Sequence, residues 1–110
     1  MLQIVDFQLN GTTFKLKEMS FKQARQHVNE GRELMKRGDD VTSDEWYDRT
    51  IKTVASAIVD MQGFDEGSVE KPWTIERLQD ELSVGSINTL FMKVLEISGL
   101  KMPPGGVTAA

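Results

Sequence analysis

The chain has 110 residues, 39% of them hydrophobic and 27% charged, with a formal net charge of −4 at pH 7, which suits one ordinary globular domain. It contains no cysteine, which excludes disulfides, thiol chemistry and cysteine–zinc sites. No apolar run approaches the roughly 20 residues that span a bilayer, and the N-terminus lacks the basic start of a signal peptide, so we expect a cytoplasmic protein without a membrane partner.

A β-hairpin is predicted over residues 2–17. Asn10-Gly11 separates two segments of alternating apolar and polar residues, and this dipeptide favours a two-residue turn. Such a turn pairs Asp6 with Lys15 on one face and gathers the apolar side chains on the other. The apolar face then holds Val5, Phe7, Leu9, Phe14 and Leu16. Two strands alone are marginal in water, so this face must pack on helices or on another chain, and both outer edges are expected to lack a strand partner.

Four helices are predicted after the hairpin, at about 21–37, 43–62, 75–82 and 84–98. Helix starts are marked by S-x-x-Q and T-x-x-E capping boxes and by a serine before the last helix. The capping residues are Ser20 with Gln23, Thr42 with Glu45, and Ser83. Apolar residues recur with helical spacing in the first helix (Phe21, Ala24, Val28, Leu34/Met35) and in the second (Tyr47, Ile51, Val54, Ala55, Ile58, Val59). Gly99 is a natural end for the last helix.

The predicted architecture is α+β and mostly α, with the N-terminal hairpin packed on three to four helices in one domain over residues 1–100. Between the second and third helices, "FDEGSVEKP" is typical of an acidic loop. The proline- and glycine-containing tail over residues 101–110 is expected to be disordered.

The sequence carries no pattern typical of a catalytic, metal or cofactor site. His27 is the only histidine, so it has no histidine partner for metal binding or acid–base catalysis, and we expect it to be partly exposed. An EF-hand loop starting at Asp40 would need glycine at Glu45 and glutamate at Ile51. Phosphate-loop, dinucleotide and nucleophile-elbow motifs do not occur. We therefore expect a protein that is not an enzyme and takes no cofactor.

The last predicted helix has more apolar residues than one buried stripe requires. Ile87, Leu90, Phe91, Val94 and Leu95 form that stripe, while Met92 and Ile97 fall outside it and Leu100 follows the glycine. The helix is either sandwiched within a small core or exposes an apolar patch to a partner. In a chain this short we favour the patch, and we expect a partner or a second subunit to contact six residues. These are Met92, Ile97, Leu100, Phe91, Val5 and Phe7.

Charge is divided unevenly along the chain. Residues 1–38 hold seven Lys/Arg against four Asp/Glu, whereas residues 39–110 hold six against thirteen. This division suits head-to-tail association of identical subunits, but it also fits two solvated faces of different sign. A small nucleic-acid-binding regulator is an alternative, with phosphate contacts from Lys22, Arg25, Arg32 and Lys36. Interrupting glutamates and the acidic net charge argue against nucleic acid.

Three segments resemble the tail assembly chaperones of long-tailed (siphovirus-type) bacteriophages. The first, "FQLNGTTFKLKEMSFKQARQ", is a hairpin that runs into a helix through a capping serine. The second, "IKTVASAIVDMQG", is a central helix that closes in a loop. The third, "WTIERLQDELSVGSINTLFMKVLEISGL", is a short helix, a break and a helix ending in Ser-Gly-Leu.

This resemblance implies a non-enzymatic role in phage tail morphogenesis. Such proteins bind the tape measure protein and keep it soluble while major tail protein subunits assemble around it. They act in the host cytoplasm, are absent from the mature virion, and often have a longer form made by frameshifting, which would place the junction at residues 101–110. A homo-oligomer would cover apolar surface at rest. Another phage tail or connector protein, which stays in the particle, is a further alternative.

Overall fold

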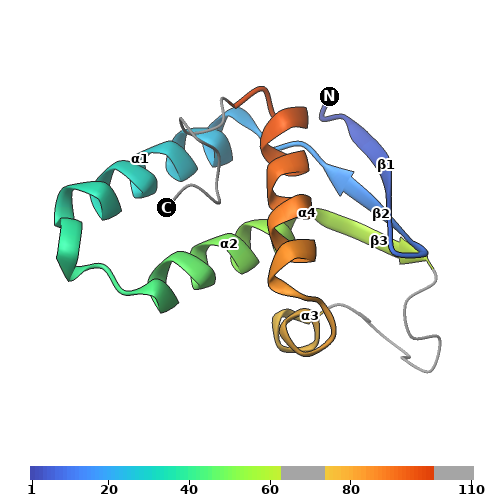
Figure 1. Cartoon of the computed structure of the whole chain (residues 1–110). Helices are drawn as coiled ribbons and strands as arrows, with labels where there is room; N and C mark the ends of the chain where they lie inside the picture. The colour runs from blue at the N-terminus through green and yellow to red at the C-terminus, as the bar shows by residue number, and fades with distance from the viewer. Residues whose placement is uncertain (63–73, 101–110) are drawn as a thin grey trace.

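The computed structural model describes residues 1–62 and 74–100, and it has an N-terminal antiparallel sheet and four α-helices (Figure 1). The predicted α+β, mostly α, class is confirmed. The elements are β1 (Ile4–Leu9), β2 (Thr12–Lys17), α1 (Phe21–Arg37), the 3₁₀ turn η1 (Gly38–Asp40), α2 (Ser43–Ala57), β3 (Ile58–Gln62), α3 (Ile75–Glu81) and α4 (Val84–Ile97). The segments predicted as an acidic loop and as a disordered tail lie outside the described residues.

The hairpin forms in the predicted register. Asn10 and Gly11 both adopt positive φ, 51° and 81°, as the turn between two twisted strands requires. Phe7 lies opposite Phe14, and Lys15 forms a 3.1 Å ion pair with Asp6 on the outer face. The apolar face of the hairpin is turned toward the helices, where Phe14 is fully buried.

The predicted second helix is too long, because residues 58–62 form a strand. Helix α2 ends at Ala57, and β3 then pairs antiparallel with β2 to give the strand order β1-β2-β3. The expectation that both hairpin edges lack a partner is therefore wrong for β2. Ile58 and Val59 are β-branched residues that suit a strand, and pairing with β2 overrides their fit to the helical stripe. The outer edge of β1 has no strand partner among residues 1–62 and 74–100.

The helix ends agree with the local signals. Both predicted capping boxes are present, at Ser20 and Thr42, and Ser83 caps α4. Gly99 has a φ of 73°, and the Leu100 N–H donates to the Leu95 carbonyl at 2.9 Å. The Gly99 N–H also donates to the Glu96 carbonyl at 3.1 Å, which completes a Schellman termination.

Helix α4 is packed from more than one side, which explains its excess of apolar residues. It contacts α2 and strand β2, and in Figure 1 its ribbon stands between the sheet on one side and α1 with the start of α2 on the other. Its buried side chains join those of the sheet, α2 and α3 in one core. That core contains Phe14, Leu16, Ile51, Val54, Ala57, Ile58, Leu78, Leu90, Phe91, Val94 and Leu95. The sandwiched alternative is thus the one that the structure shows for most of α4.

Candidate protein-interaction surface

Helix α1 stands apart from the core. None of its 17 residues is buried, and together with the start of α2 it projects away from the sheet and α4 (Figure 1). We call residues 21–48 the arm. The arm bears five of the large hydrophobic side chains that the structure exposes, Phe21, Val28, Met35, Trp46 and Tyr47. A long helix that buries no residue is stabilised little by packing within its own chain. The arm is therefore the main candidate for contact with another protein.

One side of α1 combines exposed apolar and basic residues. Phe21 (86% exposed), Val28 and Met35 (74% exposed) are seven residues apart, which places them along one stripe of the helix. Arg25 and Arg32 lie next to this stripe, since each follows an apolar member by four residues. A shallow groove runs along this side, and we call it the α1 groove. It is lined by Phe21, Ala24, Arg25, Val28, Asn29, Arg32 and Leu100.

The far end of the arm, which we call the arm tip (residues 38–48), has the opposite charge. Two aromatic residues in the first turns of α2 are exposed there, Trp46 and Tyr47, the latter at 56%. Four exposed carboxylates surround them in the sequence, from Asp39, Asp40, Asp44 and Asp48. The arm therefore presents a basic, apolar groove on α1 and an acidic, aromatic tip.

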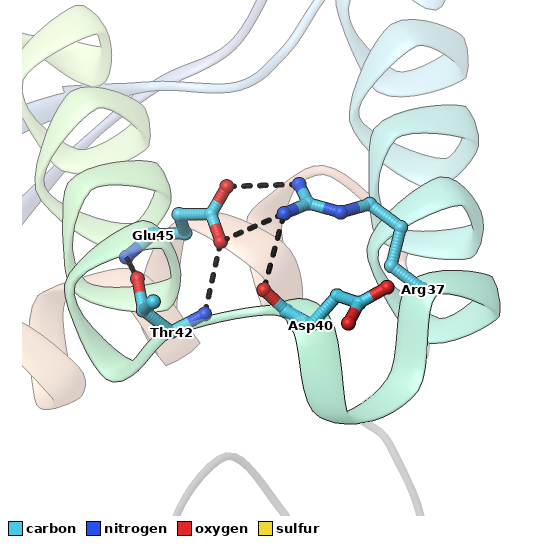
Figure 2. Close-up of polar contacts among 4 residues, drawn as sticks. All are labelled: Arg37, Asp40, Thr42 and Glu45. Atoms are coloured by element: carbon cyan, nitrogen blue, oxygen red, sulfur yellow. Dashed lines mark hydrogen bonds and ion pairs between the residues drawn. The ribbon is translucent and has the colours of Figure 1, made fainter.

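A polar clasp fixes the turn between α1 and α2 (Figure 2). Arg37 donates to both carboxylate oxygens of Glu45, at 2.8 and 3.1 Å, and to the Asp40 carbonyl at 3.3 Å. The same carboxylate accepts from the Thr42 backbone N–H at 2.9 Å. These hydrogen bonds lower the pKa of Glu45 and raise that of Arg37. The clasp holds the two helices of the arm at a defined angle even though few apolar contacts join them.

A second polar contact fastens the middle of α1 to α2. Arg49 donates to the His27 carbonyl at 2.9 Å, and its guanidinium nitrogens lie 3.0 and 3.2 Å from the two ring nitrogens of His27. Neutral imidazole has one acceptor nitrogen, so one of these two ring contacts is a hydrogen bond. A Cβ at Gly31 would lie 2.8 Å from Arg49 Nη2, so glycine leaves the space that the guanidinium occupies. The His27 ring also contacts Phe91 of the core, with centroids 5.7 Å apart.

The position of His27 predicts a loss of stability in mild acid. Its burial and then the charge of Arg49 lower the pKa of His27 from 6.5 to about 4. The unfolded chain takes up this proton between pH 6.5 and 4 while the folded chain does not, so the unfolding free energy falls as the pH falls through that window. For a half-buried ring we expect a loss of about 1–2 kcal/mol.

Urea denaturation of the wild type and of His27→Gln at about pH 7 and about pH 4.5 measures this effect. The wild type is expected to lose more stability than the variant over this interval, because carboxylates titrate in both proteins and only the wild type has the imidazole. Equal losses would show that His27 is not kept neutral by its surroundings.

The six residues predicted to bind a partner do not form one exposed surface. Phe91 is buried in the core, and Ile97, Leu100, Val5 and Phe7 are half-buried and pack against it. Among the six, Met92 alone is exposed, at 39%. Arg25 and Arg32 of the arm were named from sequence for the nucleic-acid alternative, but the exposed apolar residues of the arm were not predicted as a contact surface. The sequence feature that marks these apolar residues is their seven-residue spacing in α1. This spacing does not show whether another part of the same chain covers them.

The described residues offer no sign of a metal site or a membrane span. Within residues 1–62 and 74–100, no three His, Cys, Asp or Glu side chains come together where a metal ion could be held. Along the same ranges, no helix is both long enough and apolar enough to cross a membrane. Comparison of the chain with protein-family models, with curated proteins and with solved structures finds no match.

Proposed function

We propose that the protein is a tail assembly chaperone of a long-tailed bacteriophage. It self-associates, has no enzymatic activity, and binds the tape measure protein and tail tube subunits in the host cytoplasm without entering the mature virion. The observation that supports this proposal is the apolar stripe of α1, which stays exposed on a helix with no buried residue. Tape measure proteins are long and helical, and a groove between apolar and basic side chains suits an amphipathic helix.

The arm has the chemical features that a chaperone of this kind needs. Its apolar side chains give contact area, and the adjacent arginines keep the surface hydrated when no partner is bound. The clasp at Arg37 and the contact at Arg49 hold the helix in place before binding, which reduces the ordering cost of association. A shallow, open groove of this type favours protein partners over small molecules.

Co-expression with the tape measure protein of the same phage tests the proposal. The soluble fraction of the tape measure protein is expected to rise when the chain is present, because its apolar segments are then covered. Val28→Asp is expected to reduce this gain, since it places a charge in the centre of the α1 stripe.

Val84→Asp is the matched control. Val84 is also exposed but lies outside the arm, in the first turn of α4, where a carboxylate is favourable. A tape measure protein that stays in the pellet beside the wild-type chain would contradict the proposed function.

A nucleic-acid-binding regulator is a second candidate because Lys22, Arg25, Arg32 and Lys36 are all exposed on α1. Phosphate contacts from these side chains would make binding fall steeply with salt. Electrophoretic mobility of DNA and RNA over a range of salt concentrations separates the two functions. An unchanged mobility at low salt would exclude this candidate.

A further inference from the structure

Two surfaces of the arm, the α1 groove and the arm tip, are complementary to each other. The α1 groove combines apolar side chains with Arg25 and Arg32, and Lys22 lies one turn away from Arg25. The arm tip combines exposed aromatic side chains with carboxylates. Both surfaces belong to one chain, but no residue of the tip lines the groove, and Arg49 holds α2 against His27 and Gly31, which lie on another side of α1. The tip of one copy is therefore held away from its own groove, whereas the groove of a second copy is open to it.

We propose that two copies of the chain form a dimer by exchanging arm tips, so that the tip of each arm docks in the α1 groove of the other copy. This inference rests on the self-association that the proposed function includes, and it names the two surfaces through which the copies associate. The aromatic side chains Trp46 and Tyr47 enter the groove, where Phe21 and Val28 contact them. The carboxylates of the tip then lie beside the arginines of the groove.

The direction of the helices supports this arrangement. Helix α1 begins at the base of the arm, and α2 begins at its tip. When two arms lie antiparallel, α2 of the second copy runs alongside α1 in the same direction. Asp44 and Asp48 of the second copy then come level with Lys22 and Arg25. Because both tips dock in the same way, the contact has two-fold symmetry and closes as a dimer, the commonest form of homo-oligomer.

Charge complementarity favours the arm tip, over the other surfaces of a second copy, as the occupant of the α1 groove. Two α1 stripes packed antiparallel would place Arg25 of one copy near Arg32 of the other, and like charges repel there. Helix α3 offers an alternative acidic surface, with Ile75 exposed and with Glu76, Asp80 and Glu81 along the helix. It presents no exposed aromatic side chain among its described residues, whereas aromatic residues dominate the energetics of protein contacts. The arm tip is thus the better occupant of the groove.

Charge reversal on both surfaces tests the proposal by sedimentation equilibrium. The wild type is expected to dimerise, and Arg25→Glu and Asp48→Lys are each expected to raise the Kd at least about tenfold. An equimolar mixture of the two variants is expected to dimerise with nearly the wild-type Kd. In that heterodimer, one contact joins the two substituted positions, whose charges are interchanged, and the other contact keeps the native Arg25 and Asp48. Both contacts are therefore complementary, and the two substitutions compensate each other.

Asp80→Lys is the matched control, because it makes the same charge change on α3, and its Kd is expected to stay at the wild-type value. Circular dichroism verifies that each variant keeps its helices, since all three positions are exposed. A wild type that stays monomeric at about 100 µM, well above the Kd range of specific dimers, would overturn the arm-tip exchange. Failure of the mixed Arg25→Glu and Asp48→Lys variants to associate would also overturn it. The same holds for a dimer that Asp80→Lys weakens and Asp48→Lys does not. The solubility of the tape measure protein is a separate measurement, so the proposed function can fail or hold independently.

Discussion

Leu90→Ala is expected to lower the unfolding free energy by about 2–5 kcal/mol, while Met92→Ala changes it by no more than about 0.5 kcal/mol. Both residues lie on α4, two positions apart. Leu90 is fully buried within the core, so its truncation leaves a cavity as well as losing the transfer free energy of the side chain. Met92 is 39% exposed and outside the core cluster. A domain of this size has only about 5–15 kcal/mol of stability, so the Leu90 variant is at risk of unfolding.

Urea denaturation followed by circular dichroism measures the two effects, with unchanged m-values as the sign that the unfolded states are comparable. Because the Leu90 variant loses so much stability, the measurement is best made at low temperature. A large loss at Met92 would mean that its side chain is packed more tightly than its exposure indicates. A small loss at Leu90 would contradict the position of α4 in the centre of the core.

The hairpin and the helix starts could be predicted from sequence because they depend on neighbouring residues. Asn10-Gly11 fixes the turn, and once the turn is fixed the register follows, including Phe7 opposite Phe14. Ser20 and Thr42 cap helices through groups three residues away. Gly99 ends α4 for the same local reason. In each case, residues within about one turn of each other determine the local conformation.

Strand β3 could not be predicted in this way. Ile58 and Val59 continue the helical spacing of α2, and the same two residues are also good strand formers. The choice between helix and strand depends on pairing with β2, which is more than 40 positions away in the chain. A local pattern carries no information about such a partner.

The burial of the residues predicted to bind a partner could not be read from sequence for a related reason. An amphipathic pattern shows that an apolar stripe exists but not which element covers it. The stripe of α4 is covered by the sheet and α2, although the excess of apolar residues on this helix suggested an exposed patch. The stripe of α1 looks like an ordinary core-facing helix and remains exposed. The small size of the core accounts for both results, since it has room for α4 but not for α1 as well.

Arg49→Ala is expected to release α1 from α2 and to lower the unfolding free energy by about 2 kcal/mol, the range of hydrogen bonds from a charged donor. Arg49 donates to the His27 carbonyl and fills the space beside Gly31, and no buried apolar residue of α1 replaces these contacts. Arg49→Lys is expected to recover only part of the loss, because an ammonium lacks the planar fork that reaches the carbonyl and the ring together. Lys52→Ala, an exposed change on the same helix, is the control.

Amide hydrogen exchange distinguishes release of the arm from general destabilisation. In Arg49→Ala, the amides of α1 are expected to lose protection while those of β2 and α4 keep most of theirs, because the latter belong to the core that contains Phe14 and Leu90. If the arm must be held in place to bind, the same variant also associates more weakly without any change in the α1 groove itself. Uniform loss of protection across α1, β2 and α4 would instead show that the arm and the core unfold as one unit, and that Arg49 stabilises the whole domain.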